Sequence, residues 1–214
     1  MTDTKQRILD TAECLFAENG FAATSLRAII AKAGVNLAAI HYHFHSKDAL
    51  LEAVILRRAA PANQERMKLL DRCEHEAGNQ PPTIEKVIEA FVAPAFRQAR
   101  DPALGGPVFR HLIGRLYAEG DMMPRIIVTH FRPLLERFTS ALRRALPEVP
   151  PEELMWRIHF ATGVVAQALR GTGALEMFGV LHETSNSELV LDRLVTFLSA
   201  AFRAPLMKKA AQGG

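Results

Sequence analysis

The residues best suited to contact a charged polymer lie between Asn19 and Lys47. This stretch contains no Asp or Glu, whereas Arg27, Lys32 and Lys47 add positive charge to it. Duplex DNA presents a dense line of phosphates, so a carboxylate-free face removes repulsion where the two would meet. The pattern predicts a surface that can approach nucleic acid, although three small helices that merely form a core would also satisfy it.

Two short helices joined by a tight turn would position these residues. Thr24 or Ser25 can cap the first helix, and Gly34 supplies the positive backbone dihedral that such a turn needs. Ile40 and Phe44 are expected to anchor the second helix to the core. The side chains left on its outer side or at its N-terminal end are Asn36, Leu37, Ala38, His41 and Tyr42. A recognition helix presents such positions to the major groove.

Other kinds of chemistry find little support in the sequence. His41 and His45 are four residues apart, but His43 points elsewhere and no Cys or carboxylate with ligand spacing lies nearby, so we expect no metal and no cofactor. The chain lacks the motifs of serine hydrolases, phosphate-binding loops, zinc proteases and paired-cysteine sites, so we do not expect an enzyme. Cys14 and Cys73 are expected to be buried, reduced thiols.

Composition gives only coarse limits. The 214 residues are 49% hydrophobic and 23% charged, as in ordinary globular proteins. A formal net charge of +3 is too small to argue for nucleic-acid binding by itself. No apolar run approaches about 18 residues and the N-terminus has no secretory pattern, so we expect a cytoplasmic protein that does not bind membranes.

Almost every periodic segment predicts helix, so the expected fold is all-α with about nine helices. The predicted helices cover residues 4–18, 25–34, 37–43, 47–76, the segment from 83 through Pro94, 106–119, 122–146, 151–170 and 187–202. Pro61 interrupts the fourth, and Pro133 lies inside the seventh. We expect a helix-turn-helix DNA-binding domain at 1–50 and a helical ligand-binding and dimerisation domain at 51–214.

The segment TSLRAIIAKAGVNLAAIHYHFHSKDALLEAV resembles the DNA-binding domain of the TetR (TetR/AcrR) family of bacterial transcription regulators. The preceding ILDTAECLFAENGFAATS is similar to the first helix of that family and its Asn-Gly-Phe corner. The likeness covers Arg7 to Val54. VNLAAIHYHFHSK and PANQERMKLLD also resemble a subset typified by PsrA, a regulator that responds to long-chain fatty acids.

The resemblance implies roles for residues around the turn. Thr24 and Ser25 should meet phosphate through their hydroxyl and backbone N–H groups. Arg27 matches a position that reaches a base edge or the backbone. Lys47 matches a lysine of the family that contacts phosphate.

The resemblance also implies that Asn36, Leu37 and Ala38 form the groove-facing start of the recognition helix. Leu37 and Ala38 have no hydrogen-bonding side chain, so they can read only shape or a thymine methyl group. The family usually has tyrosine where this chain has His41. Tyr42, one residue later, is the candidate to replace that phosphate contact.

The last two predicted helices are apolar around much of their circumference, which favours a homodimer with a four-helix interface, although burial within one subunit would also explain it. Residues 156, 160, 164 and 167 form one face of the helix at 151–170. The opposite face and its counterpart on the last helix give the predicted interface, which consists of Leu154, Ile158, Ala161, Val165, Leu169, Leu191, Leu194, Val195 and Leu198.

Aromatic residues gather in the middle helices, where prolines can open a cavity between diverging helices. The expected pocket residues are Phe91, Phe109, Leu112, Ile113, Leu116, Phe131, Leu135 and Phe160, with Arg110, His111, Arg115 and Gln167 as candidates to hold a polar head. The expected partners are therefore double-stranded DNA, a second copy of the chain, and a small lipophilic effector such as a fatty acid or an acyl derivative. The alternative is an all-α dimeric interaction protein that does not bind specific DNA.

Overall fold

The computed structural model describes residues 3–99, 101, 106–116, 122–170 and 187–206. Within these residues the chain forms ten helices and no strand, which confirms the all-α prediction. The helices are α1 (Thr4–Asn19), α2 (Leu26–Ala33), α3 (Leu37–Phe44), α4 (Lys47–Ala77), α5 (Ile84–Gln98), α6 (Gly106–Leu116), α7 (Met122–His130), α8 (Arg132–Ala145), α9 (Pro151–Arg170) and α11 (Ser187–Phe202).

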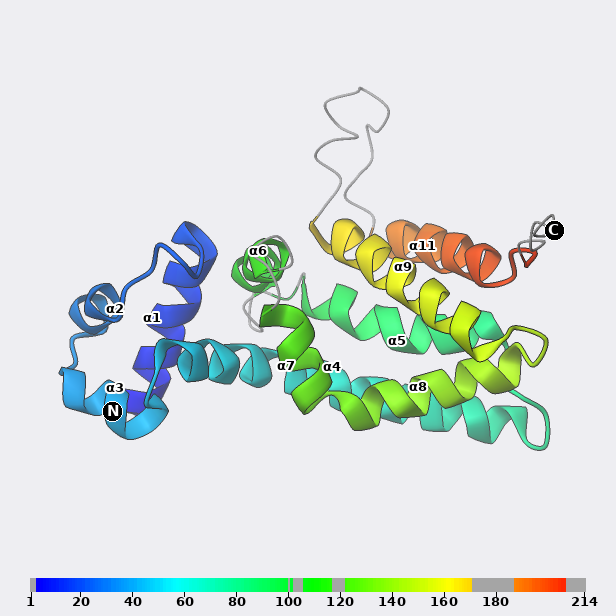
Figure 1. The fold of residues 1–214 in the computed structure, drawn as a ribbon, viewed down its shortest axis with the longest axis horizontal. Helices are drawn as coiled ribbons and strands as arrows, with labels where there is room; N and C mark the ends of the chain where they lie inside the picture. Colours follow the sequence, from blue (N-terminus) through cyan, green and yellow to red (C-terminus); the bar gives the residue numbers. More distant parts are fainter. Residues whose placement is uncertain (1–2, 100, 102–105, 117–121, 171–186, 207–214) are drawn as a thin grey trace, which may run out of the picture.

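Helices α1, α2 and α3 and the first turns of α4 form the N-terminal unit (Figure 1). Its core contains the completely buried side chains of Phe16, Ile29, Ile40 and Leu50, one from each of the four helices. Apolar residues at helical spacing therefore point inward in every element of the unit, as the periodicity predicts.

Helix α4 connects the N-terminal unit to a bundle made with α5, α8, α9 and α11 (Figure 1). The helix continues through Pro61 for 31 residues. Val54 and Ile55 near its start belong to the core of the N-terminal unit, whereas Leu70 belongs to the core of the bundle. One rigid element thus enters both cores.

Helices α6 and α7 pack against the N-terminal unit rather than into the bundle core. Leu112 and Leu116 of α6 and Ile126 of α7 are buried in the same cluster as Ile8 and Phe16 of α1. Part of the core of the N-terminal unit therefore comes from α6 and α7, about 100 residues after α1 in the chain.

The single helix expected over residues 122–146 is two helices, α7 and α8, which meet at Phe131. Pro133 lies in the first turn of α8, where the missing N–H costs nothing because no helical partner exists for it. The prediction placed Pro133 inside a helix, but a new helix starts there. The predicted 106–119 helix is described to Leu116, and its last residues lie outside the described part.

Cys14 and Cys73 are free and half-buried, not fully buried as expected. Burial is the main cause that raises the pKa of each thiol, so both stay protonated near neutral pH. None of the described helices is long and apolar enough to cross a membrane.

Candidate functional site

The turn between α2 and α3 is built from local side-chain caps and one glycine. Ser25 Oγ accepts the Ala28 N–H at 3.1 Å and starts α2. Gly34 ends that helix in the left-handed region, at φ 62° and ψ 41°, where a side chain would be strained. Asn36 Oδ1 then accepts the Ala39 N–H at 2.8 Å and starts α3.

Helix α3 presents an apolar outer surface. Ile40 and Phe44 are buried, which turns the opposite side of the helix outward. Leu37 is 52% exposed and Tyr42 is 80% exposed, and Ala38 and His41 are exposed beside them. The structure therefore brings the five predicted groove residues to one exposed side and end of α3.

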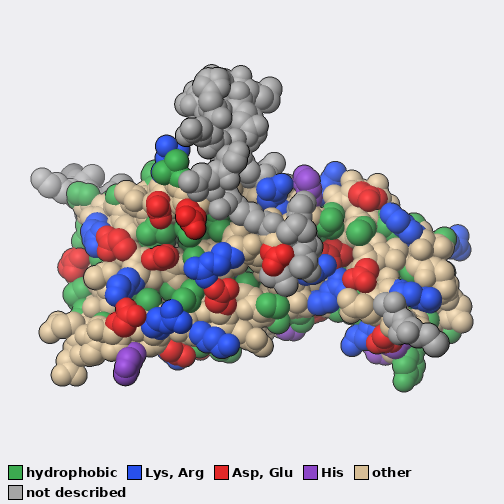
Figure 2. Space-filling view, turned by 180° about the vertical axis from the view of Figure 1, so that it is seen from behind, with side chains coloured by type: hydrophobic (Ala, Val, Ile, Leu, Met, Phe, Trp, Pro, Cys, Tyr) green, Lys and Arg blue, Asp and Glu red, His purple; other side chains and the backbone are tan. Residues whose placement is uncertain are grey.

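Among the described residues we see no broad patch of positive charge that would mark the surface of α3 as a DNA-binding surface. Figure 2 shows acidic and basic side chains interspersed over the face that it presents. Arg27 is exposed on α2, and Lys32 lies 3.6 Å from Glu18. Binding of DNA by this unit would therefore depend on the geometry of α2 and α3 rather than on a broad positive patch.

Thr24 does not have the role that we expected for its side chain. It is only 2% exposed, and its hydroxyl lies 2.7 Å from the Gly20 carbonyl oxygen and 3.1 Å from that of Leu15. Both carbonyls belong to the end of α1 and the loop after it, so the hydroxyl fastens this corner. The sequence could not predict the burial of Thr24, because that burial depends on how α1 packs against the corner. The hydroxyl was therefore expected to be free for phosphate.

Lys47 also serves the corner between α1 and α2. Its Nζ donates to the carbonyl oxygens of Phe21, at 2.8 Å, and Thr24, at 2.9 Å, and lies 4.3 Å from the centre of the Phe21 ring. An ammonium group has three N–H donors, and two of them are used here. Lys47 therefore ties the start of α4 to the loop before α2.

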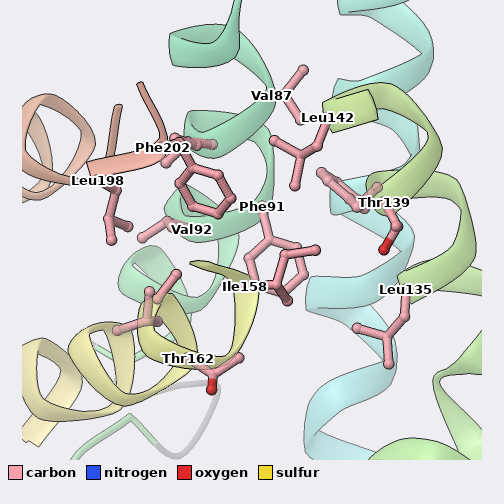
Figure 3. A pocket seen from close by; sticks show the side chains of 14 residues that line it. Val87, Phe91, Val92, Leu135, Thr139, Leu142, Ile158, Thr162, Leu198 and Phe202 are labelled. Carbon is pink, nitrogen blue, oxygen red and sulfur yellow. The ribbon is translucent and has the colours of Figure 1, made fainter. Parts of the chain in front are cut away.

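The bundle contains an apolar cavity of about 80 Å³ between α5, α8, α9 and α11. Phe91, Leu135, Ile158 and Leu198 are among the side chains around it, and the hydroxyl groups of its lining come from threonines (Figure 3). Its wall contains no charged residue. The cavity is thus suited to an apolar body and offers no partner for a carboxylate.

Most of the predicted pocket residues lie elsewhere. Of the eight apolar candidates, Phe91 and Leu135 line the cavity. The candidates that instead pack in the core of the N-terminal unit are Phe109, Leu112, Ile113, Leu116 and Phe131. Four of these side chains lie on α6, which packs on α1, and Phe131 immediately precedes α8, so none of the five lines the bundle cavity.

The four polar candidates and Phe160 also lie away from the cavity. Arg110 is half-buried on α6, and His111 and Arg115 are exposed on the same helix. Phe160 and Gln167 are exposed on α9. None of these side chains lines the cavity, so the expected head-group site is not supported.

The predicted dimer residues face the interior of their own subunit. Leu154, Leu194 and Leu198 are buried in the bundle core. The remaining predicted residues pack partly buried against the same core, and they are Ile158, Ala161, Val165, Leu169, Leu191 and Val195. The sequence identified two apolar faces on α9, and the one that we expected at the interface packs on the core of its own subunit.

The opposite face of α9 is the exposed one. Trp156 is 54% exposed and Phe160 is 62% exposed, and their rings stack with centroids 5.7 Å apart. Gly163, one turn further on, is also exposed, and a side chain added there would meet nothing within 4 Å. Phe197 and Leu189 are exposed on α11. Soluble monomers rarely leave a large patch of apolar side chains exposed, and the stacked Trp156 and Phe160 rings form an exposed apolar patch on α9.

Sequence reasoning missed a charged cluster that joins the N-terminal unit to the bundle. Glu13 of α1 is only 2% exposed, and it pairs with Arg57 at 2.5 Å and with Arg58 at 2.8 Å, both from α4. Gln98 of α5 donates to the Arg58 carbonyl oxygen at 2.6 Å. A glutamate among the inward positions of α1 was the available signal, because a buried carboxylate needs cationic partners.

A second contact, also missed, links the cavity to α4. Arg66 Nε donates to the Phe91 carbonyl oxygen at 2.7 Å, and the guanidinium carbon lies 4.7 Å from the centre of the Phe91 ring. The Phe91 ring also meets Phe138 edge-on, with centroids 5.1 Å apart. Phe91 therefore touches the cavity and α4 at the same time.

Two family models match the chain. The model described as "Bacterial regulatory proteins, tetR family" matches residues 8–54. The model described as "Tetracyclin repressor-like, C-terminal domain" matches residues 89–201. The first covers the N-terminal unit as far as the start of α4, and the second covers most of the remaining helices.

Curated relatives match mainly at the N-terminus. The uncharacterized HTH-type transcriptional regulator YerO of Bacillus subtilis is 31% identical over 101 residues, which are 47% of this chain and 33% of YerO. The HTH-type transcriptional regulator UidR of Escherichia coli K12 is 41% identical over 54 residues, which are 25% of this chain and 28% of UidR. The chain thus covers about a third or less of the length of these relatives. Their names give no support to the expected fatty-acid-responsive subset.

Solved structures share the fold over almost the whole chain. A putative tetR family transcription regulator from Shewanella sp. PV-4 has a TM-score of 0.60 at 20% identity and covers 91% of this chain and 97% of its own. SmeT, the repressor of the Stenotrophomonas maltophilia multidrug efflux pump SmeDEF, has a TM-score of 0.58 at 24% identity, covering 92% of this chain and 90% of its own. At these identities the likeness establishes the fold alone.

Proposed function

The chain belongs to the TetR family of bacterial transcriptional regulators, and from this premise we propose that it is a repressor controlled by a small apolar effector. In this proposal two copies bind a near-palindromic operator, residues 1–50 contact the DNA, and residues 51–214 bind the effector and form the dimer. The observation that carries the proposal is the exposed outer side of α3 above a capped helix-turn-helix.

In the proposed complex α3 lies in the major groove and α2 faces the phosphates. Leu37, Ala38 and Tyr42 meet the base edges, and Arg27 reaches the backbone or a base from α2. The Ser25 N–H and the remaining donor of Lys47 would meet phosphate, whereas Thr24 would not, because its N–H donates to the Phe21 carbonyl oxygen at 3.3 Å and its hydroxyl is buried. Asn36 and His41 complete the surface at either side of Leu37.

The proposed dimer forms through the exposed side of α9 and α11. Trp156, Phe160 and Phe197 supply the large apolar side chains that carry most of the binding energy in interfaces. Glycine inside a helix costs up to about 1 kcal/mol relative to alanine, yet no atom of the described residues would contact a side chain at Gly163. Close approach of a partner helix would explain it. A two-fold dimer would hold its two α3 helices one DNA turn apart, at ~34 Å.

The size of the cavity suggests how an effector would act. A cavity of about 80 Å³ is smaller than the ~150 Å³ engineered cavity that accepts benzene. An apolar effector must therefore displace side chains, and Phe91 is the one that also touches α4. A displaced Phe91 would shift Arg66 and, through α4, the N-terminal unit. The effector must bind the DNA-incompetent arrangement more tightly for any switch to occur.

Selection of bound duplexes from a randomised library at low salt tests the DNA-binding part. We expect an inverted repeat whose half-site centres are about 10 base pairs, or a multiple of that spacing, apart. The matched control is Tyr42→Ala combined with Leu37→Ala, which removes exposed side chains without touching the core. If the wild type enriches no sequence, the protein is a dimeric interaction protein and the proposal fails.

Native mass spectrometry of the purified protein tests the effector part. We expect a co-purified or added apolar molecule to bind once per chain and to lower operator affinity. Arg66→Met keeps the length of the side chain but removes its hydrogen bond to Phe91, so this variant should bind the molecule and still hold DNA in its presence. Equal release of DNA by Arg66→Met and wild type would contradict the assigned route.

A further inference from the structure

Most hydrogen-bonding side chains around α3 are already used inside the protein. The Asn36 amide oxygen accepts the Ala39 N–H at 2.8 Å, and His41 Nδ1 lies 3.2 Å from the His45 carbonyl oxygen. The Thr24 hydroxyl and two donors of Lys47 bind backbone carbonyls of the corner before α2. These contacts start helices or fasten loops, so using them to read a base would weaken the unit that holds α3.

The exposed surface of α3 is apolar at its start, and one turn later it includes the Tyr42 hydroxyl and the His41 ring. Leu37 and Ala38 lie at its start, and Tyr42 lies one turn after Ala38 on the same side. The sequence of α3, LAAIHYHF, contains no Arg, Lys, Gln or Glu. The common bidentate readers of guanine and adenine are thus missing from the helix body, and Asn36 at its cap could pair with adenine through both amide atoms only by giving up the hydrogen bond that starts α3.

The major groove offers one apolar group that distinguishes bases, the C5 methyl of thymine. A half-exposed leucine at the start of a recognition helix can bury that methyl against its own methyl groups. Cytosine has a hydrogen in place of that methyl beside its amino group, and guanine presents two hydrogen-bond acceptors. A leucine pressed against them would leave polar atoms without water or a partner.

Building on the proposed function, we propose that Leu37 selects thymine in each operator half-site by packing against its C5 methyl group. Leu37 is then the specificity-determining residue of α3, with Ala38 beside it keeping the groove accessible. Burial of one methyl is worth about 0.8 kcal/mol, so loss of one contact should weaken binding about fourfold. Loss in both half-sites should weaken binding about 15-fold, which is the same constant applied twice.

Deoxyuridine tests this directly because it differs from thymidine only by lacking that methyl. The selected operator is synthesised with each symmetric pair of thymines replaced in turn, and wild-type affinity is measured by fluorescence anisotropy. We expect one pair at which the replacement weakens binding about 15-fold. A wild type that tolerates uracil at every thymine within twofold would overturn the proposal.

Variants assign the effect to the residue. Leu37→Ala should bind the normal operator about 15-fold more weakly and lose its sensitivity to uracil at that pair, whereas Leu37→Met should keep the sensitivity. Leu206→Ala removes a leucine that is similarly exposed but lies far from α3, and this variant should behave as wild type. Full methyl sensitivity in Leu37→Ala would assign the contact to another side chain and overturn the proposal.

The proposed function can fail separately from this inference. If no duplex is enriched by the wild type, DNA binding itself is wrong and the assignment of Leu37 falls with it. If an operator is enriched and bound by two chains but no thymine methyl matters, the regulator stands and the inference alone is overturned. Circular dichroism of each variant confirms that α3 and its unit remain folded.

Discussion

Helix α3 in the N-terminal unit and helix α9 in the bundle both expose large apolar side chains, but their surroundings differ. Around α3, the nearby polar groups cap helices or fasten loops, and the exposed apolar surface is narrow. On α9, two aromatic rings stack in the open beside a glycine that its own subunit does not use. The first surface suits a groove with defined chemistry, and the second suits an identical partner.

The difference shows how exposure should be interpreted. A few exposed apolar groups held by a rigid, well-capped frame can read a shape, whereas the exposed Trp156 and Phe160 rings of α9, with His159 against both, form a wider surface that a partner would cover. Variants of Phe160, Asn36 and Glu85 each act on one of the two regions, whereas Glu13 belongs to the cluster that joins them.

The largest effect is expected from Phe160→Arg, which places a charge in the proposed dimer surface. Each subunit contributes the residue once, so two buried aromatic contacts worth at least about 2 kcal/mol each are lost. Analytical ultracentrifugation should show dimer association weakened about 1,000-fold, with loss of operator binding. Ser140→Arg, an exposed change on α8, is the control. A Phe160→Arg dimer of unchanged affinity would remove this face from the interface.

The next largest effect is expected from Glu13→Ala, because it leaves Arg57 and Arg58 without their shared partner. Breaking a buried ion pair from one side costs about 3 kcal/mol here, near the low end because both arginines remain partly exposed. Urea denaturation measures the loss. Glu18→Ala removes an exposed carboxylate from the same helix and should cost below about 1 kcal/mol. Equal costs for the two variants would contradict a structural role for the cluster.

A smaller effect is expected from Asn36→Ala, which removes the cap of α3. Loss of an N-cap costs about 1 kcal/mol, so thermal unfolding should shift by a few degrees while the bundle is unaffected. Asn36→Asp keeps the acceptor oxygen and should restore stability, although its charge would repel phosphate. A stable Asn36→Ala variant with normal DNA affinity would show that α3 needs no cap.

The smallest effect is expected at the far end of the bundle, where Arg203 binds Glu85. The hydrogen bonds from Arg203 lower the pKa of Glu85 below its usual 4.5. Since the folded pKa is depressed, the stabilisation is present above the unfolded pKa and is lost as pH falls through the folded value. Both side chains are substantially exposed, so Glu85→Gln should cost below about 1 kcal/mol at pH 7. The difference from wild type should shrink as the pH falls below the unfolded pKa of Glu85, and a difference that grows with acid would contradict the sign.

Local signals in the sequence predicted the N-terminal unit well. Ser25, Gly34 and Asn36 act within three or four residues of their own position, so their types alone indicate where α2 ends and α3 begins. The inward positions of α3 follow from helical spacing for the same reason. What the sequence could not provide is the use of Thr24 and Lys47, because their partners depend on how α1 packs.

The sequence could not predict which helix faces meet in the bundle, because these contacts join residues far apart in the chain. Helix α9 has two apolar faces at the same spacing, and periodicity cannot tell which one meets α5 and which one remains open. Helix α6 has one strong apolar face, but only the fold shows that this face meets α1. Phe109 and Phe160 therefore lie away from the cavity for different reasons. Phe109 packs against the core of the N-terminal unit, and Phe160 is exposed on α9.

The salt dependence and stoichiometry of operator binding test the central claim most directly. A fluorescence-anisotropy titration of the wild type on its selected inverted repeat, between about 50 and 200 mM salt, yields both quantities. The account predicts two chains per duplex and an affinity that falls with salt at a log–log slope steeper than about −4, as expected for at least about five neutralised phosphates. A flat salt response, or saturation by a single chain, would contradict it.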